Sequence, residues 1–243
     1  MRMNRIKLFS AFVLTMVIGM ILLGGNKAGA TVIETFDNPP PGAVKWKVVD
    51  YNRKTTHPAR IPYKVSGGIA FDFLNTPDTA LLGTSHPSYR GDLIGDMTGK
   101  MLTATLGVTV MPSTIFTYYG QPGACGTPPT VRFYFQTDTS GKFEETDYWW
   151  SNALAPPVSA KLDDLRLSDA TISALMSDGS KWSNYYGHFG NNPAYNAAFN
   201  AAVRDVQFVG LSFGGGCFFE NGVGIQPGSG SGSFRLMDFT ATP

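Results

Sequence analysis

The stretch from residue 193 to residue 239 constrains the fold more than any other part of the sequence. Tyr195, Phe199 and Val203 recur every four residues, which predicts a helix over residues 193–203 with one apolar stripe. An Asn-Pro pair at its start supplies a helix cap and a favourable first position. The stripe needs an apolar surface to lie on, so we expect the helix to pack on a sheet or across one end of it.

The rest of this stretch has the pattern of β-strands. A core strand is expected over residues 205–213, and a closing strand over 233–239 alternates apolar and polar residues. The alternation includes a slip near Met237 that keeps Phe239 on the apolar face. Such half-buried strands are typical of antiparallel sheets with one face toward the core.

Turn residues separate short alternating segments along most of the remaining chain. About ten strands are expected, and residues 168–176 predict a second short helix with Ser168 as its cap. Trp46 lies in the second strand, where we expect it to anchor the core. The predicted fold class is all-β, an antiparallel jelly-roll β-sandwich with one or two short helices.

Residues 1–30 form a predicted signal peptide. A basic start with Arg2, Arg5 and Lys7 precedes an apolar run, and a small-residue site ends at Ala30. Cleavage there leaves residues 31–243 as a single domain exported to the periplasm or the exterior. No later apolar run is long enough to span a membrane.

The charge of the mature chain argues against one class of partner, and its two cysteines predict a disulfide. The signal peptide holds four of the 19 basic residues and none of the 18 acidic ones, so the mature chain is weakly acidic. It has no basic run, which argues against nucleic acid as a partner. Cys125 and Cys217 are the only cysteines. In an exported protein, such a pair predicts a disulfide more readily than a metal site.

The whole pattern resembles the laminin IV (laminin B) type of jelly roll, which is related to galactose-binding folds. The resemblance implies an extracellular structural or ligand-binding module without catalytic residues, and similar jelly rolls serve as carbohydrate-binding modules. The cysteine pair and the glycine-rich loop before Cys217 depart from the family pattern. The matching segments are Trp46, the loop 87–92 before the strand at 99–102, residues 131–136, Trp182, residues 199–203 before the strand 206–211, and the ending at 232–239.

The resemblance also implies a place for a calcium ion. Jelly-roll modules often hold one between their first and last strands, and Glu34, Asp37 and Asp238 occupy the matching positions. Ordinary acidic residues at strand ends are the alternative explanation.

Two enzyme hypotheses have some support in the sequence. Residues 210–214 match the G-x-S-x-G motif around Ser212, but glycines follow instead of a helix and every histidine precedes the serine. Glycosidic cleavage needs paired carboxylates, and the sequence has acidic residues close together near Trp149 and Trp150. Adjacent acidic residues are, however, also common on solvated turns. These acids are Glu144, Glu145, Asp147, Asp163 and Asp164. Non-catalytic function is therefore the prediction.

The aromatic residues favour a binding site for a polysaccharide or a cell-surface or matrix component. Exposed rings stack on the apolar face of a sugar, and the loop 181–190 is dense in aromatic and amide groups without strand or helix periodicity. Trp149 and Trp150 must face opposite ways in a strand, so one of them is expected at the surface unless a loop covers it. The predicted ligand-binding residues are Trp149, Trp150, Trp182, Asn184, Tyr185, Tyr186 and His188. A purely structural or protein-interaction module, with these rings in its core, is the alternative.

Overall fold

A computed structural model describes residues 32–34, 36, 45–51, 57–118, 128–140, 142–152, 157–215 and 222–243. The predicted signal peptide, Asp37, Cys125 and Cys217 lie outside these residues. No helix in the described part of the chain is long and apolar enough to cross a membrane.

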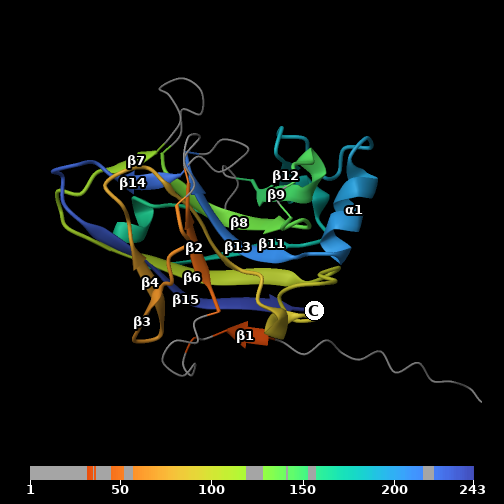
Figure 1. Ribbon diagram of the computed structural model, residues 1–243, viewed down its shortest axis with the longest axis horizontal. Coiled ribbons are helices and arrows are strands. Elements are labelled where there is room, and N and C mark those ends of the chain that lie inside the picture. Colours follow the sequence, from red (N-terminus) through yellow and green to blue (C-terminus); the bar gives the residue numbers. More distant parts are fainter. Residues whose placement is uncertain are drawn as a thin grey trace, which may run out of the picture.

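Two antiparallel sheets face each other as a β-sandwich, as the sequence predicted (Figure 1). The first sheet has six strands: β1 (Val32–Glu34), β3 (Tyr63–Val65), β4 (Gly68–Asp72), β6 (Met101–Val110), β11 (Ala170–Leu175) and β15 (Gly232–Thr242). The second sheet has nine: β2 (Lys47–Asp50), β5 (Thr79–Thr84), β7 (Phe116–Tyr118), β8 (Thr130–Gln136), β9 (Tyr148–Ser151), β10 (Ser159–Lys161), β12 (Trp182–Asn184), β13 (Phe208–Gly214) and β14 (Val223–Ile225).

The closing strand β15 organises the six-stranded sheet. It pairs with β6 along its whole length, and on its other side with β4 and then β1. The register shifts between Leu236 and Asp238, which confirms the predicted slip near Met237. Phe234 and Phe239 therefore both lie in the core and are fully buried.

Aromatic rings from the two sheets meet between them. The ring of Phe213 on β13 lies 4.9 Å from that of Phe234 and 5.5 Å from that of Phe71. Further along, Phe133 on β8 lies 5.8 Å from Phe239. Trp46 is 1% exposed and packs against Phe239, which confirms it as a core anchor.

Helix α1 (Asn196–Arg204) covers the right-hand end of the sandwich in Figure 1. Phe199 and Val203 are buried, and Phe199 lies 4.9 Å from Trp149, so the predicted stripe does pack on the sheet. The helix begins later than predicted. Asn192 accepts a hydrogen bond from the amide of Ala194 in a turn, and the helix follows that turn.

The prediction of a helix over residues 168–176 is wrong. This segment contains β11, which pairs with β6 over six residues. Ile172 and Ala174 are buried while their neighbours are not, which is the alternation of a strand. A free strand edge at β6 offered backbone hydrogen bonds that outweighed the weak local helix preference.

Four short 3-10 helices complete the described elements: η1 (Pro87–Tyr89), η2 (Glu145–Asp147), η3 (Asp164–Arg166) and η4 (Gly179–Lys181).

Candidate ligand-binding site

The structure buries the three tryptophans that were predicted to contact a ligand. Trp149, Trp150 and Trp182 are 0%, 1% and 0% exposed. The first two do face opposite ways, as strand geometry requires, because Trp149 lies in the core between the sheets and Trp150 in a second cluster. The prediction that one of them is exposed is wrong, since both faces of β9 are covered.

Trp182 begins the short strand β12, which pairs with β9. Its ring lies 5.1 Å from that of Phe135, and its indole nitrogen donates to the carbonyl oxygen of Leu175 at 3.0 Å. Three residues are too few for a visible alternation, so the sequence resembled a loop. Trp182 is a core residue and not a stacking platform.

Trp150 belongs to a small apolar cluster on the outer face of the nine-stranded sheet, with Ala80, Leu81, Tyr134 and Phe208. Its indole nitrogen donates to the hydroxyl of Ser212 at 3.2 Å. Ser212 lies inside β13 and is fully buried, instead of standing at a turn before a helix. The geometry therefore differs from that of a hydrolase nucleophile.

Beside this cluster, four aromatic rings form a surface that we call the Tyr186 patch: Phe143, Tyr148, Tyr185 and Tyr186. Phe143 is 51% exposed and Tyr186 is 59% exposed, while the other two are half-buried. The ring of Phe143 lies 4.8 Å from Tyr185 and 6.4 Å from Tyr186, edge to face in both pairs. The loop before β9 and the turn after β12 thus bring together rings that are about forty residues apart in the sequence.

A stack of rings leads from the exposed Phe143 inward to the buried Trp150. Phe143 and Tyr148 stack at 5.6 Å with 18° between their planes, and Tyr148 and Trp150 stack at 6.4 Å with 22°. Trp150 in turn contacts Tyr134 at 5.0 Å. The exposed rings therefore rest on a packed aromatic column, which restricts their rotation before any ligand binds.

Asn184 shapes the turn that carries Tyr185 and Tyr186. Its side-chain oxygen accepts hydrogen bonds from the amides of Tyr186 at 3.1 Å and His188 at 2.9 Å. Gly187 takes a positive φ of 83°, which glycine adopts without strain. Asn184 was predicted to contact a ligand directly, but it is 0% exposed and acts instead on the backbone of the turn.

Polar side chains lie on the same two segments of the chain as the patch rings, Glu145 after Phe143 and His188 after Tyr186. The side-chain nitrogen of Asn184 donates to a carboxylate oxygen of Glu145 at 3.0 Å, and the same oxygen lies 3.5 Å from Nδ1 of His188. The imidazole stacks on Tyr195 at 4.3 Å and keeps 41% of its side chain exposed. Nδ1 of His188 is buried, so the exposed part of its imidazole and the carboxylate of Glu145 are the polar groups that a ligand can reach on these segments.

Sequence reasoning found Tyr185, Tyr186 and His188 but missed Phe143 as a binding residue. It considered Glu145 only as an acid on a turn. The isolated Phe143 carries no periodic signal, and only its position opposite the 185–188 turn reveals the surface they share.

Glu34 and Asp238, two of the three predicted calcium ligands, point to opposite faces of the sheet, and Asp37 lies outside the described residues. Glu34 lies opposite Phe239 in the β1–β15 register, and its carboxylate accepts hydrogen bonds from the hydroxyl of Tyr89 and the amide of Phe36. Asp238 neighbours Phe239 and so points to the opposite face. Among the described residues, no group of three or more His, Cys, Asp or Glu side chains could hold a metal. Calcium binding and the disulfide between Cys125 and Cys217 both stay predictions.

No protein-family model and no curated protein matches the chain. Among solved structures it is similar to a "xylan-binding module CBM15", at 13% identity and a TM-score of 0.40, over 86% of this chain and 97% of that one. It is also similar to a chain described as "Prominent members of the human gut microbiota express endo-acting O-glycanases to initiate mucin breakdown", at 9% identity and a TM-score of 0.45, over 87% and 98%. We draw no function from likenesses this distant, and the laminin IV resemblance stays a prediction.

Proposed function

We propose that this chain is an exported, non-catalytic module that binds a glycan of a polysaccharide or of a cell or matrix surface, and that the Tyr186 patch is its contact surface. The observation that carries the proposal is the pair of exposed rings, Phe143 and Tyr186, on a buried aromatic column. Contiguous exposed aromatic surface often marks a binding site.

The chemistry of the patch suits a sugar ring. The C–H face of a pyranose is apolar and packs against an aromatic face, while its hydroxyls need donors and acceptors at the edge. Phe143, Tyr185 and Tyr186 supply the faces, and the same loop and turn carry the polar side chains of Glu145 and His188. The rigid column lowers the entropy cost of ordering the rings on binding.

Three of the five acidic residues considered for glycosidic cleavage have other contacts. Glu145 binds Asn184, Asp147 accepts a hydrogen bond from Thr137 at 2.9 Å, and Asp163 pairs with Arg166 at 2.7 Å. These contacts support a structural role for the acids, so we keep the non-catalytic proposal. A protein-interaction module that uses the same patch is the competing function.

Glycan arrays and affinity electrophoresis with soluble polysaccharides would test the proposal. Tyr186→Ala and Phe143→Ala each remove one exposed ring, and we expect each to weaken binding by about 1 kcal/mol or more, roughly fivefold. Leu167→Ala is the matched control, because Leu167 is 88% exposed at the end of η3, away from the patch. Tyr186→Ala and Leu167→Ala should unfold within about 0.5 kcal/mol of wild type. Phe143→Ala loses ring contacts with Tyr148 and Tyr185 and should cost about 1 kcal/mol or more of stability, so its binding is measured where it is fully folded.

Three outcomes separate the hypotheses. Loss of binding in the two patch variants but not in Leu167→Ala supports the proposal. Equal binding by all variants would exclude the patch. Absence of any retained glycan, together with a protein ligand that depends on Tyr186, would favour the protein-interaction alternative.

A further inference from the structure

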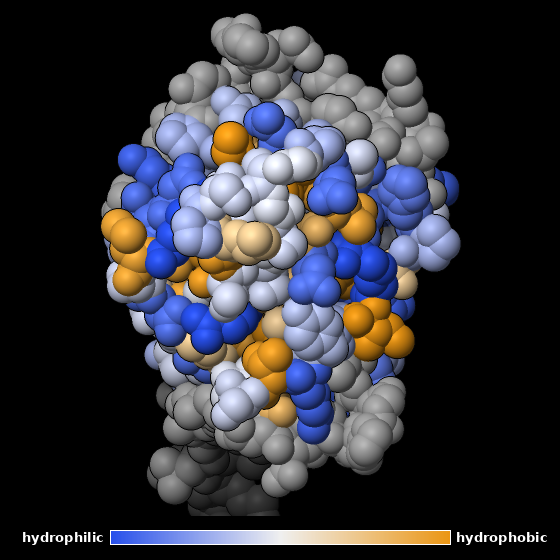
Figure 2. All heavy atoms as spheres, turned by 90° about the vertical axis from the view of Figure 1, so that its left-hand side faces the viewer, coloured by the Kyte–Doolittle hydropathy of each residue, from blue (hydrophilic) through white to orange (hydrophobic). Residues whose placement is uncertain are grey.

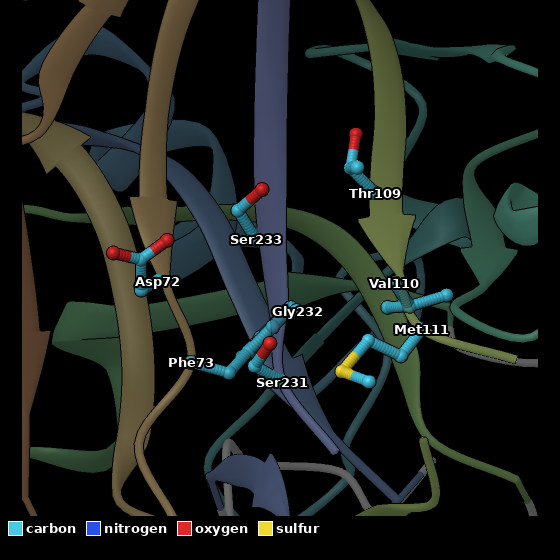
Figure 3. A pocket seen from close by; sticks show the side chains of 8 residues that line it. All are labelled: Asp72, Phe73, Thr109, Val110, Met111, Ser231, Gly232 and Ser233. Atoms are coloured by element: carbon cyan, nitrogen blue, oxygen red, sulfur yellow. The ribbon is translucent and has the colours of Figure 1, made fainter. Parts of the chain in front are cut away.

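A groove of about 520 Å³ opens at the end of the six-stranded sheet. It lies where β4 and β6 end and β15 begins, at the left-hand end in Figure 1, whereas β9, β12 and the Tyr186 patch lie toward the right-hand end. The volume is within the range of about 300 to 1,000 Å³ that is typical of small-molecule sites. Its lining residues, labelled in Figure 3, are Asp72, Phe73, Thr109, Val110, Met111, Ser231, Gly232 and Ser233.

Strand register sets a row of polar side chains along this groove. Ser233 on β15 pairs directly with Asp72 on β4 and with Thr109 on β6. Directly opposed residues point to the same face with Cβ atoms about 4.5 to 5.5 Å apart. Figure 3 shows the three side chains pointing to the same side of the sheet, so one carboxylate and two hydroxyls face one space.

Asp72 has an oxygen available for a ligand. One carboxylate oxygen accepts a hydrogen bond from the hydroxyl of Tyr63 at 2.8 Å, and the other has no partner among the described residues. The carbonyl oxygen of Asp72 accepts from Arg60 at 2.8 Å, which holds its backbone. Burial, followed by the hydrogen bond to Asp72, raises the pKa of Tyr63.

The end of the groove is apolar and is held by hydrogen bonds. Met111 is 52% exposed, and its amide donates to the carbonyl oxygen of Ser231 at 3.2 Å. The hydroxyl of Thr114 donates to the same oxygen at 2.9 Å. These contacts join the two loops that border the groove, so its shape is formed before a ligand enters.

The surrounding surface favours a small polar ligand over a protein. Figure 2 shows this end of the molecule, where hydrophobic residues stand singly among hydrophilic and neutral ones. A protein interface centres on a continuous apolar core, which the visible surface does not provide.

We propose that this groove, which we call the Asp72 groove, is a second ligand site that takes one sugar residue of a neutral oligosaccharide. The free oxygen of Asp72 accepts hydrogen bonds from ligand hydroxyls, Ser233 and Thr109 exchange hydrogen bonds with others, and Met111 contacts the C–H face. The site is independent of the Tyr186 patch, so either can exist without the other.

Amide chemical-shift mapping would test the groove directly. The probes are soluble neutral gluco-, xylo-, manno- and galacto-oligosaccharides, with glycerol and sorbitol to identify a site for simple polyols. We expect at least one oligosaccharide to shift the amides of Asp72, Thr109 and Ser233. Asp72→Asn should then weaken that binding about tenfold or more, while its amide oxygen still accepts from Tyr63 and preserves the fold.

Two controls keep this test separate from that of the Tyr186 patch. Asp92→Asn removes a carboxylate on the loop between η1 and β6, and Tyr186→Ala alters only the patch; neither should change binding in the groove. Shifts confined to the patch would overturn the groove and leave the proposed function intact. Equal shifts with glycerol, or none at the groove with any probe, would also overturn it.

Discussion

Replacement of Trp182 by alanine tests whether this ring belongs to the core or to a binding surface. In the structure the indole is 0% exposed, lies 5.1 Å from the ring of Phe135 and donates a hydrogen bond to the carbonyl of Leu175. A core role predicts that the variant loses stability. A binding role predicts that it keeps its stability and loses affinity.

The expected loss follows from the buried area. An aromatic side chain of this size buries about 150 to 250 Å², which at ~25 cal/mol per Å² corresponds to about 4 to 6 kcal/mol. Alanine retains part of that burial, and Trp-to-Ala changes in cores typically cost about 3 to 5 kcal/mol. Since single domains are stable by about 5 to 15 kcal/mol, Trp182→Ala should remove roughly a fifth or more of the total.

Urea unfolding followed by circular dichroism measures this loss. With a slope of about 1 to 3 kcal/mol per molar urea, the midpoint should fall by about 1 to 5 M. Trp182→Phe is the matched control, because it keeps a ring but not the indole donor, and should cost about 1 to 2 kcal/mol. A Trp182→Ala protein with a midpoint within about 0.3 M of wild type would refute the core assignment.

Three further predictions concern other buried contacts. Burial and then the hydrogen bond to Glu34 raise the pKa of Tyr89. The contribution of this group to stability is therefore present below its pKa in the unfolded chain, about 10, and declines at higher pH. Tyr89→Phe should flatten the fall of the melting temperature above pH ~10, and an unchanged slope would contradict this. A Cβ atom at Gly224 would lie 2.0 Å from a backbone carbonyl oxygen. Gly224→Ala should therefore lower the free energy of unfolding by about 1 to 3 kcal/mol or more. A stability in urea equal to that of wild type would contradict this and show that the backbone relaxes. Arg60 lies 2.5 Å from the carboxylate of Asp50, whose side chain is 2% exposed. Arg60→Met should therefore lower the free energy of unfolding by about 3 kcal/mol, and adding Asp50→Asn should recover part of that loss. If a double-mutant cycle shows no recovery, the ion pair is not the cause.

Some features of the fold could be predicted from local sequence patterns alone. The apolar stripe of Phe199 and Val203 and the register shift near Met237 were predicted correctly, because each follows from the geometry of one segment. The opposite directions of Trp149 and Trp150 were readable for the same reason. Residues 168–176 were misread because a short segment with mixed preferences takes the conformation that a neighbouring strand edge stabilises.

The candidate sites depended more on tertiary structure than the fold did. Tyr185, Tyr186 and His188 were found in the sequence, but the contact between Phe143 and Tyr186 arises only because the loop before β9 meets the turn after β12. The main error was the predicted exposure of the tryptophan side chains. An aromatic-rich loop has the same sequence signature whether its rings face water or the core, and the packing of β9 and β12 placed Trp182 in the core.

The sequence by itself determined the class of the protein: alternating segments and turn residues specify antiparallel strands, and strand geometry then assigns each side chain to one face or the other. Only the tertiary structure decided which of those faces are covered and which residues become neighbours. Asp72, Thr109 and Ser233 are far apart along the chain and form one row because β15 pairs with β4 on one side and β6 on the other. Alternation is a local property of the backbone, whereas exposure and adjacency depend on which strands pair, and for that reason both sites became visible only in the folded chain.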